Sequence, residues 1–301
     1  MLTPTHAPPG RFYSLLLAYH VFPLHAPITL WLLDAPFGRF SIPSVLNLPG
    51  NISWAAMELA APLTFYATLP PLATLTPRAR LLAAAYLTHY AHRAILSPLV
   101  LAPRRAPLHV AVVACALAFN VLNASLLALS LPAFPPPGGL TFWAGMVLWA
   151  AGFIGNIYHD EILHDLRRPA ARRLVSSPAD DGPANKSGKY HVPRGGWFAL
   201  VSFPNYLCEW LEWTGFAIAA APSVFVAVPP LASLQLSGWI ASASALLPEA
   251  AWPRVLLAAP WAFVLAEVTS MLPRALRGHA WYQRTFAAYP AERKAAIPWL
   301  L

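Results

Sequence analysis

Residues 152–213 read GFIGNIYHDEILHDLRRPAARRLVSSPADDGPANKSGKYHVPRGGWFALVSFPNYLCEWLEW. An apolar run leads into this stretch, and polar side chains then follow at a spacing of roughly three to four residues, so they share one helix face: Asn156, Asp160, His164 and Arg167. After a polar, basic connection a second apolar run carries Asn205, Glu209 and Glu212 at the same spacing. Two apolar helices with facing polar stripes, joined by a basic loop, predict a site for an anionic cofactor. The alternative is that the polar residues mark two helix ends that emerge into water. This alternative explains Asn156, Asn205 and Glu209 less well, because they are expected to lie further inside the membrane than the residues near Arg167.

The composition is typical of a polytopic membrane protein. Hydrophobic residues make up 57% of the 301 residues and charged residues only 11%, whereas a soluble domain carries about 25% charged residues. Many of the 33 prolines lie between apolar runs, and the others need neighbouring helices to satisfy the freed carbonyls. Cys115 and Cys208 both fall in apolar segments, so no disulfide framework is expected. We expect no nucleic-acid partner, and the sequence does not indicate an oligomeric state.

Seven apolar runs are long enough to cross about 30 Å of hydrocarbon. They are Phe12–Leu33, Ile52–Leu72, Ala79–Leu101, Leu108–Leu131, Leu140–Leu163, Phe198–Val226 and Trp252–Leu272. Leu231–Leu247 is too polar to count as an eighth run. Most Lys and Arg residues lie in the connections after the first, third and fifth runs and in the C-terminal tail. The positive-inside rule therefore predicts a lumenal or outside N-terminus and a cytosolic C-terminus. We expect one all-α domain, residues 1–301, with seven transmembrane helices.

Ionisable side chains inside two of these runs point to an interior site. Glu58, in WAAMELAAPLTF, is costly to place in an apolar helix and is expected to face a cavity, although it lies near enough to the helix end to reach water. If it is buried away from positive charge, its protonated form is favoured and it can donate a proton. The third run holds HYAHR at positions 89–93. Tyr90 beside Arg93 suits hydrogen bonding to a carbonyl oxygen in a dry site; the alternative is a helix end with a snorkelling Arg.

Other polar positions carry weaker expectations. Two histidines at His89 and His92 are a weak metal signal without further ligands, so no metal site is expected. Asn120 and Asn123 are expected to hydrogen-bond between helices. The Ser176–Lys189 loop is polar and is predicted to be flexible, and Glu267 is an embedded carboxylate without an obvious partner.

The polar groups form two sets of motifs. The C-terminal set comprises Asn156-x-x-x-Asp160 with Leu166–Arg167, YHVPRGG at 190–196, Asn205–Tyr206 with Glu209 and Glu212–Trp213, and a final run of Trp281–Tyr282, Phe286, Tyr289–Pro290, Arg293–Lys294 and Ile297–Pro298. The N-terminal set is Met57–Glu58 and the run from His89 to Arg93. With these motifs the chain resembles the steroid 5α-reductase family of integral-membrane reductases. The related enoyl reductases of fatty-acid elongation share the C-terminal set but tend to lack the N-terminal one.

The resemblance implies NADPH-dependent reduction of a carbon–carbon double bond conjugated to a ketone, with the C4–C5 bond of a 3-oxo-Δ4-steroid as the expected target. It implies that Glu58 and Tyr90 bind the carbonyl oxygen as catalytic residues, with Arg93 also on the substrate side. It places the substrate side in residues 1–135 and the cofactor side in residues 140–301. The implied cofactor-binding residues are Arg105, Asn156, Asp160, Arg167, Tyr190, Asn205, Glu209, His279 and Tyr282.

The resemblance also implies a small lipophilic substrate, a surrounding of membrane lipids, and a location in the endoplasmic reticulum with the cofactor site facing the cytosol. The sequence has no Gly-rich dinucleotide fingerprint, so NADPH is expected among helices and not on a Rossmann sheet. Three features depart from the family: His191 replaces the usual Lys or Arg, Gly278 precedes His279 where two histidines are common, and the Ser176–Lys189 loop is longer.

Two alternatives remain open. One is a reductase of another lipid enone or an enoyl thioester, of the long-chain enoyl-CoA or polyprenol type; Glu58 and Tyr90 favour a ketone over an isolated alkene. The other is a lipid transporter whose embedded polar groups line a path. The lack of internal repeats and the gathering of polar groups toward one membrane face argue against a transporter.

Overall fold

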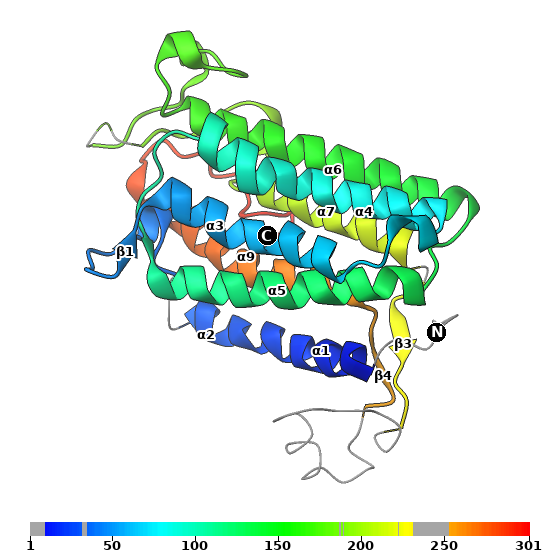
Figure 1. Ribbon diagram of the computed structural model, residues 1–301. Helices are drawn as coiled ribbons and strands as arrows, with labels where there is room; N and C mark the ends of the chain where they lie inside the picture. Colours follow the sequence, from blue (N-terminus) through cyan, green and yellow to red (C-terminus); the bar gives the residue numbers. More distant parts are fainter. Residues whose placement is uncertain (1–9, 32–34, 187, 189, 222, 231–252) are drawn as a thin grey trace.

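The computed structural model describes residues 10–31, 35–186, 188, 190–221, 223–230 and 253–301, and its described part is mostly helical (Figure 1). The Leu231–Leu247 stretch, which was not expected to be a span, lies outside the described residues. Eight α-helices are described: α1 Gly10–Val21, α2 Ala26–Trp31, α3 Gly50–Thr68, α4 Pro77–Tyr90, α5 Val110–Ala133, α6 Gly139–Asp165, α7 Pro204–Ala220 and α9 Ala259–Thr285.

Shorter turns and strands connect these helices. The 3-10 segments are η1 Phe22–His25, η2 Gly38–Phe40, η3 Leu72–Thr74, η5 Ala170–Arg172, η6 Pro178–Asp180 and η7 Gly196–Ala199, and a π-helix, η4, covers Ala91–Leu101. Two antiparallel two-stranded sheets pair β1 Asn47–Leu48 with β2 Leu108–His109, and β3 Phe225–Ala227 with β4 Val255–Leu257. In the first, Asn47 faces His109; in the second, Val226 faces Leu256.

Each of the seven predicted runs contains helix. In the first, third and sixth runs, prolines accompany the departures from one continuous α-helix. The first run is divided into α1, η1 and α2, with Pro23 within η1. The third continues from α4 into η4, which carries Pro98. The sixth run begins as helix only at Pro204, the first position of α7. Proline lacks an amide hydrogen and has a fixed φ, so it starts helices well and interrupts them.

The seventh helix reaches much further than its apolar run. The run was predicted to end at Leu272, but α9 continues to Thr285. It thereby carries His279 and Tyr282 on the same helix as Glu267, with Pro273 between them. At the start of the Ser176–Lys189 loop, Ser177 and Asp180 form a capping box, and Asp181 forms a bidentate ion pair with Arg173; the flexibility of this loop stays a prediction.

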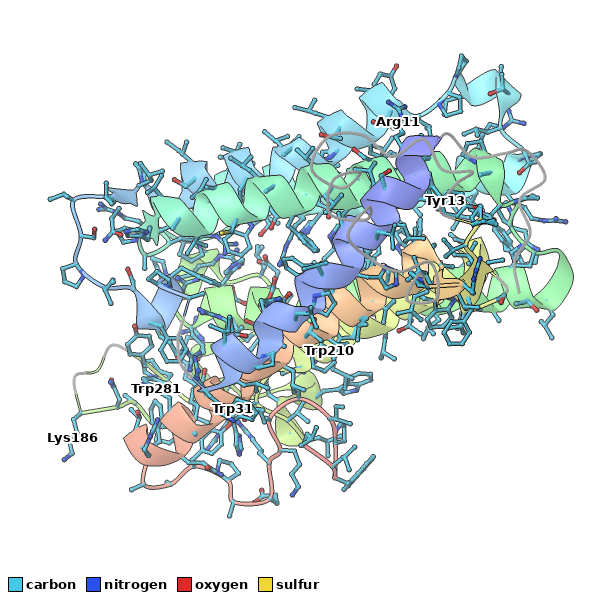
Figure 2. The ribbon with its side chains drawn as sticks, turned by 90° about the horizontal axis from the view of Figure 1, so that it is seen from below. Arg11, Tyr13, Trp31, Lys186, Trp210 and Trp281 are labelled. Atoms are coloured by element: carbon cyan, nitrogen blue, oxygen red, sulfur yellow. The ribbon has the colours of Figure 1, made fainter. Side chains whose placement is uncertain are left out.

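Five helices close a ring. In order around it, α3 contacts α5, α5 contacts α9, α9 contacts α7, α7 contacts α4, and α4 contacts α3. Helix α6 packs outside this ring against α7, and α1 lies across α5 and α9 (Figures 1 and 2). Asn120 of α5 donates to the carbonyl of Met57 in α3 (2.8 Å), and Asn123 accepts from the hydroxyl of Tyr19 in α1 (3.2 Å). The expectation of interhelical bonds from both asparagines is confirmed.

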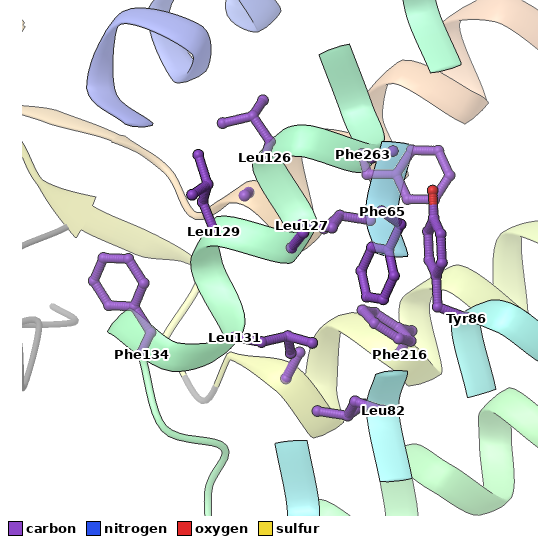
Figure 3. Close-up of a cluster of buried hydrophobic side chains, with 14 of the residues drawn as sticks. Phe65, Leu82, Tyr86, Leu126, Leu127, Leu129, Leu131, Phe134, Phe216 and Phe263 are labelled. Carbon is purple, nitrogen blue, oxygen red and sulfur yellow. The ribbon is translucent and has the colours of Figure 1, made fainter. Parts of the chain in front are cut away.

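The largest buried cluster fills one end of the ring with aromatic and aliphatic side chains (Figure 3). Phe65 of α3 stacks on Tyr86 of α4 (4.1 Å between centroids), and Trp213 of α7 packs on Phe263 of α9 (4.6 Å). These contacts fix the relative heights of four helices, which decides where their polar residues meet.

Of the helices that the structure describes, α5 and α6 are long and apolar enough to cross a bilayer. Within an 18-residue apolar stretch of each helix, only 33% of α5 and 22% of α6 is buried inside the protein. Most of their apolar surface therefore faces outward, as lipid-facing helices require.

Glycines allow α6 and α7 to approach closely. A Cβ added at Gly152 would lie 2.6 Å from the carbonyl oxygen of Cys208, and one at Gly145 would lie 2.6 Å from the amide nitrogen of Ala219. On α7, a Cβ at Gly215 would meet the backbone of Trp149. Small residues at such a seam are what membrane helices use to bring backbones together.

We predict that Gly152→Leu forces α6 away from α7 and destabilises the protein, because the neighbouring atoms are backbone and cannot move aside. The matched control is Ala151→Leu, which adds a similar side chain on an exposed position of the same helix turn. Thermal unfolding of the purified protein in detergent measures both. An equal melting temperature for the two variants would contradict this account of the seam.

Candidate functional site

The centre of the polar interior is Arg93, at the start of η4. Its guanidinium group forms ion pairs with three carboxylates from three helices: Glu58 of α3 (Nε–Oε1 3.6 Å), Asp160 of α6 (3.6 Å) and Glu209 of α7 (3.5 Å). The Arg93 side chain is 20% exposed. The sequence placed Glu58 and Arg93 with the substrate and Asp160 and Glu209 with the cofactor; the structure brings the two sets together.

The polar stripes of α6 and α7 do face each other. The Asn156 amide donates to the Glu209 carboxylate (3.2 Å) and to the backbone carbonyl of Asn205 (3.0 Å). The Asn205 amide in turn donates to the Asp160 carboxylate (2.9 Å). The four residues therefore form one hydrogen-bonded network, which the glycine seam between the helices makes possible.

Glu58 and Tyr90 lie on adjacent walls of the ring. The condition that Glu58 be buried away from positive charge is not met, since Arg93 is its ion-pair partner. Tyr90 is buried, and its ring packs near those of Tyr86 (4.8 Å) and Trp213 (6.4 Å). Glu58 is close enough to the Tyr90 hydroxyl to interact with it electrostatically.

The histidines of the third run have separate surroundings. His89 Nδ1 pairs with the Glu212 carboxylate at 2.7 Å, and both side chains are almost fully buried. His92 packs its ring edge-on against Phe153 (6.0 Å between centroids). In the described part of the chain, no three His, Cys, Asp or Glu side chains are arranged to hold a metal ion.

Arg105 approaches the same centre from the connection after η4. Its guanidinium lies over the ring of Trp54 in α3 (4.6 Å to the centroid), as does that of Arg93 (5.2 Å). Its backbone amide donates to the Asn51 side chain (2.7 Å). Burial lowers the pKa of Arg105 to about 10, with the charges of Arg93 and Arg167 acting in the same direction. Several cations thus converge on one region, which favours an anionic ligand.

Arg167 follows α6 and interacts electrostatically with Tyr190 and Asp160. Beside it lies a cavity of about 400 Å³, lined by Arg167, Arg168 and Arg172 on one side and by residues 100–103, 169 and 174 on the other. Arg168 is occupied structurally, because it bridges Glu161 (2.6 Å) and Asp165 (2.7 Å) and donates to the carbonyl of Leu101. The basic loop is in this way fixed to the end of η4.

The last two predicted residues lie together at the far end of α9. Tyr282 stacks on Tyr289 (5.3 Å) and accepts a hydrogen bond from Arg39 (3.2 Å). His279 pairs with the Ser202 hydroxyl (2.6 Å). Neither residue touches the Asn156 network directly. They are joined to it through the start of α7, where Phe203 contacts the Tyr282 ring (6.3 Å).

Three contributors to this region escaped the sequence interpretation: Arg39, Trp54 and Ser202. Arg39 lies over the rings of Trp281 and Tyr282 (4.6 and 4.5 Å to the centroids). Its position in a connection gave no periodic signal. Trp54, four residues before Glu58, shares its helix face, and this spacing was a signal that could have been used.

The region has a buried donor and a buried acceptor that a bound dinucleotide could satisfy. Among the described residues, the buried Nε of Arg105 and the buried Oδ1 of Asn205 have no hydrogen-bond partner. Unpaired buried polar atoms are costly and are commonly satisfied by a ligand or by water. Guanidinium groups suit phosphates and amides suit a nicotinamide carboxamide or a ribose, so the residues present fit NADPH.

The chain is similar to several known proteins. Residues 181–242 and 251–301 match the family model described as 3-oxo-5-alpha-steroid 4-dehydrogenase. The chain is 37% identical to an uncharacterized protein of Schizosaccharomyces pombe, over 91% of this chain and 94% of the relative. It is 30% identical to the human protein 3-oxo-5-alpha-steroid 4-dehydrogenase 1, over 89% and 86%. It is 29% identical to steroid 5-alpha-reductase DET2 of Arabidopsis thaliana, over 91% and 90%.

We predict that Arg93→Met destabilises the protein strongly, because three carboxylates in the bundle interior lose their shared cation. Removing one partner of a buried ion pair costs about 3–5 kcal/mol. The control is Arg80→Met on the exposed surface of α4, which is expected to unfold at the wild-type temperature. Thermal unfolding in detergent is the measurement, and an unchanged midpoint for Arg93→Met would refute the central role of this ion-pair cluster.

Proposed function

Because the chain belongs to the 3-oxo-5-alpha-steroid 4-dehydrogenase family, we propose that it reduces the C4–C5 double bond of a 3-oxo-Δ4-steroid with NADPH. The observation that carries the proposal is the Arg93 ion-pair cluster. It joins Glu58, proposed to bind substrate, to Asp160 and Glu209, proposed to bind the cofactor. A hydride donor and an enone must lie in contact, and one shared cation holds their two sets of residues together.

We assign the oxygen of the enone to Tyr90 and Glu58. NADPH, when bound, would supply a hydride for the β-carbon of the enone, and the α-carbon of the resulting enolate then takes a proton from water, which completes the reduction. As negative charge develops on the carbonyl oxygen, the Tyr90 hydroxyl donates a hydrogen bond to it, and the protonated form of Glu58 donates a second. Hydrogen bonds that strengthen with developing charge stabilise the transition state more than the ground state.

The cofactor is assigned to the opposite side of Arg93. Asn156, Asp160, Asn205 and Glu209 form the hydrogen-bonded wall, and Arg105 and Arg167 provide positive charge for phosphate groups. Tyr190 packs edge-on against Trp281 (5.2 Å), so it connects the basic loop to the end of α9 that carries His279 and Tyr282. In this assignment residues 140–301 form most of the cofactor side and residues 1–135 most of the substrate side.

We further propose that the seven helical segments each cross the membrane, with the N-terminus lumenal and the C-terminus cytosolic. The support is the coincidence of helix with all seven apolar runs and the Lys and Arg bias of the connections. This orientation places Arg105, Arg167 and Tyr282 at the cytosolic face, where NADPH is available. The endoplasmic reticulum is the proposed location, with a lipophilic substrate entering from the bilayer.

We predict that Glu58→Leu and Tyr90→Phe each lower kcat by about 10²–10³-fold with a Δ4-3-ketosteroid such as progesterone, because each removes a donor to the developing oxyanion. NADPH affinity should change little in either variant. NADPH oxidation by the detergent-purified protein measures turnover, and thermal stabilisation by NADPH measures binding. Turnover at the wild-type rate in both variants would disprove the assignment. NADPH binding without steroid turnover in the wild type would redirect the search to other lipid enones or enoyl thioesters.

We predict that Arg105→Gln weakens NADPH binding by roughly tenfold, because a charge-assisted contact to phosphate is lost. Arg104→Gln is the matched control, since Arg104 is the adjacent residue and is exposed. Titration of each purified variant with NADPH gives the Kd. If Arg105→Gln binds NADPH as tightly as Arg104→Gln does, Arg105 is not part of the cofactor site.

A further inference from the structure

The cavity beside Arg167 contains a cation that the proposed site does not use. This cavity of about 400 Å³ lies between the end of η4 and the connection that follows α6. Arg167 is assigned to the cofactor. Arg168 is bound by the carboxylates of Glu161 and Asp165. Arg172 is exposed, and in the part of the chain that the structure describes its side chain forms no ion pair or hydrogen bond. A cation without a counter-charge at a cavity favours an anionic ligand.

The connection that carries Arg172 is held in place by Asp165, the last residue of α6. The fully buried Asp165 carboxylate accepts hydrogen bonds from three successive backbone amides, those of residues 174–176 (2.8–3.1 Å). Arg168 donates to the carbonyl of Leu101 and so fastens the same connection to η4. The walls of the cavity are therefore fixed by the fold, and Asp165 is already occupied by other donors.

The cavity lies at the end of the outer face of η4. In a π-helix, side chains about four to five residues apart share a face, and the exposed apolar residues of η4 follow this spacing: Ile95, Leu96, Leu99 and Val100. Arg93 faces the interior carboxylates instead. Val100, which is 69% exposed, lines the cavity, whereas no residue of the Asn156 network does. The cavity therefore continues the lipid-facing stripe of η4 and not the cofactor site.

An anionic phospholipid fits the cation and the apolar stripe together. Leu174, in the wall that belongs to the connection after α6, is also exposed (58%). Apolar side chains thus lie on both sides of a cationic cavity. A free phosphate or a dinucleotide would use only the cation, whereas a phospholipid has a phosphate for Arg172 and acyl chains for the stripe. In the proposed orientation the cavity is at the cytosolic membrane surface, where basic pockets beside membrane helices bind anionic headgroups.

We propose that this cavity binds the headgroup of an anionic phospholipid, with Arg172 as the cation and the outer face of η4 as the contact for an acyl chain. The inference rests on the proposed membrane orientation and not on the reductase activity. Because the lipid would connect η4, which carries Arg93, to the connection after α6, its binding is expected to raise the unfolding temperature.

The test is a titration of the detergent-purified protein with dioleoylphosphatidylglycerol and, separately, with dioleoylphosphatidylcholine. Native mass spectrometry measures the bound lipid, and thermal unfolding measures its stabilising effect. The wild-type protein is expected to prefer the anionic lipid, and Arg172→Gln is expected to weaken its binding about fivefold. Lys186→Gln is the matched control, because it removes a positive charge from the same connection at an exposed position that does not line the cavity. The Kd for NADPH should be the same in all three proteins.

Glycerol 3-phosphate separates a lipid site from a phosphate site, because it has the phosphate without acyl chains. We expect it to give no stabilisation at the lipid concentrations used, and stabilisation equal to that by the anionic lipid would overturn the acyl-chain contact. Equal binding of the two lipids, or an equal loss in Lys186→Gln, would overturn the site. Weaker NADPH binding by Arg172→Gln with unchanged lipid binding would assign the cavity to the cofactor. No readout depends on steroid turnover, so failure of the reductase assay leaves this inference standing.

Discussion

A cation in an apolar helix bundle must be neutralised within the protein, and the structure depends on how this is done for Arg93. Its three ion pairs connect α3, α6 and α7 to η4, so a single guanidinium bridges four segments. A buried ion pair is rarely a net source of stability, because desolvation offsets much of the attraction. Its value here is geometric: any helix that moved away would leave a carboxylate or the guanidinium unpaired.

The close approach of α6 and α7 is the second requirement. Asn156 reaches both Asn205 and Glu209 only because the backbones are near each other, and glycines at the seam permit this. A bulkier seam would separate the polar stripes by several ångströms and expose four polar groups to hydrocarbon. Packing and polar pairing are therefore coupled: the seam creates the network, and the network makes separation of the helices costly.

Much of this could be predicted from the sequence. Hydropathy located seven runs that contain helix. Residue spacing placed Asn156, Asp160, Asn205 and Glu209 on facing helix stripes. Both results depend only on the local sequence pattern. The resemblance to the family is confirmed by the comparisons. What the sequence did not provide was pairing between distant segments. Nothing in the pattern showed that Arg93 would be shared by Glu58, Asp160 and Glu209, or that Arg39 would lie over Tyr282. The extension of α9 to Thr285 was also missed, since the hydropathy ends before the helix does.

Charge counting links the site to its unexplained residue. Glu58, Asp160, Glu209 and Glu267 all act on Arg93, which is one cation against four carboxyl groups. Arg105 and Arg167 add positive charge on the Asp160 side, toward the proposed cofactor. The Glu267 side has no such addition among the described residues. An excess of carboxyl groups on one wall is tolerated only if hydrogen bonds share the charge or a proton is retained. Asn156 and Asn205 meet the first condition for two of these groups, because their side-chain amides donate to the carboxylates of Glu209 and Asp160.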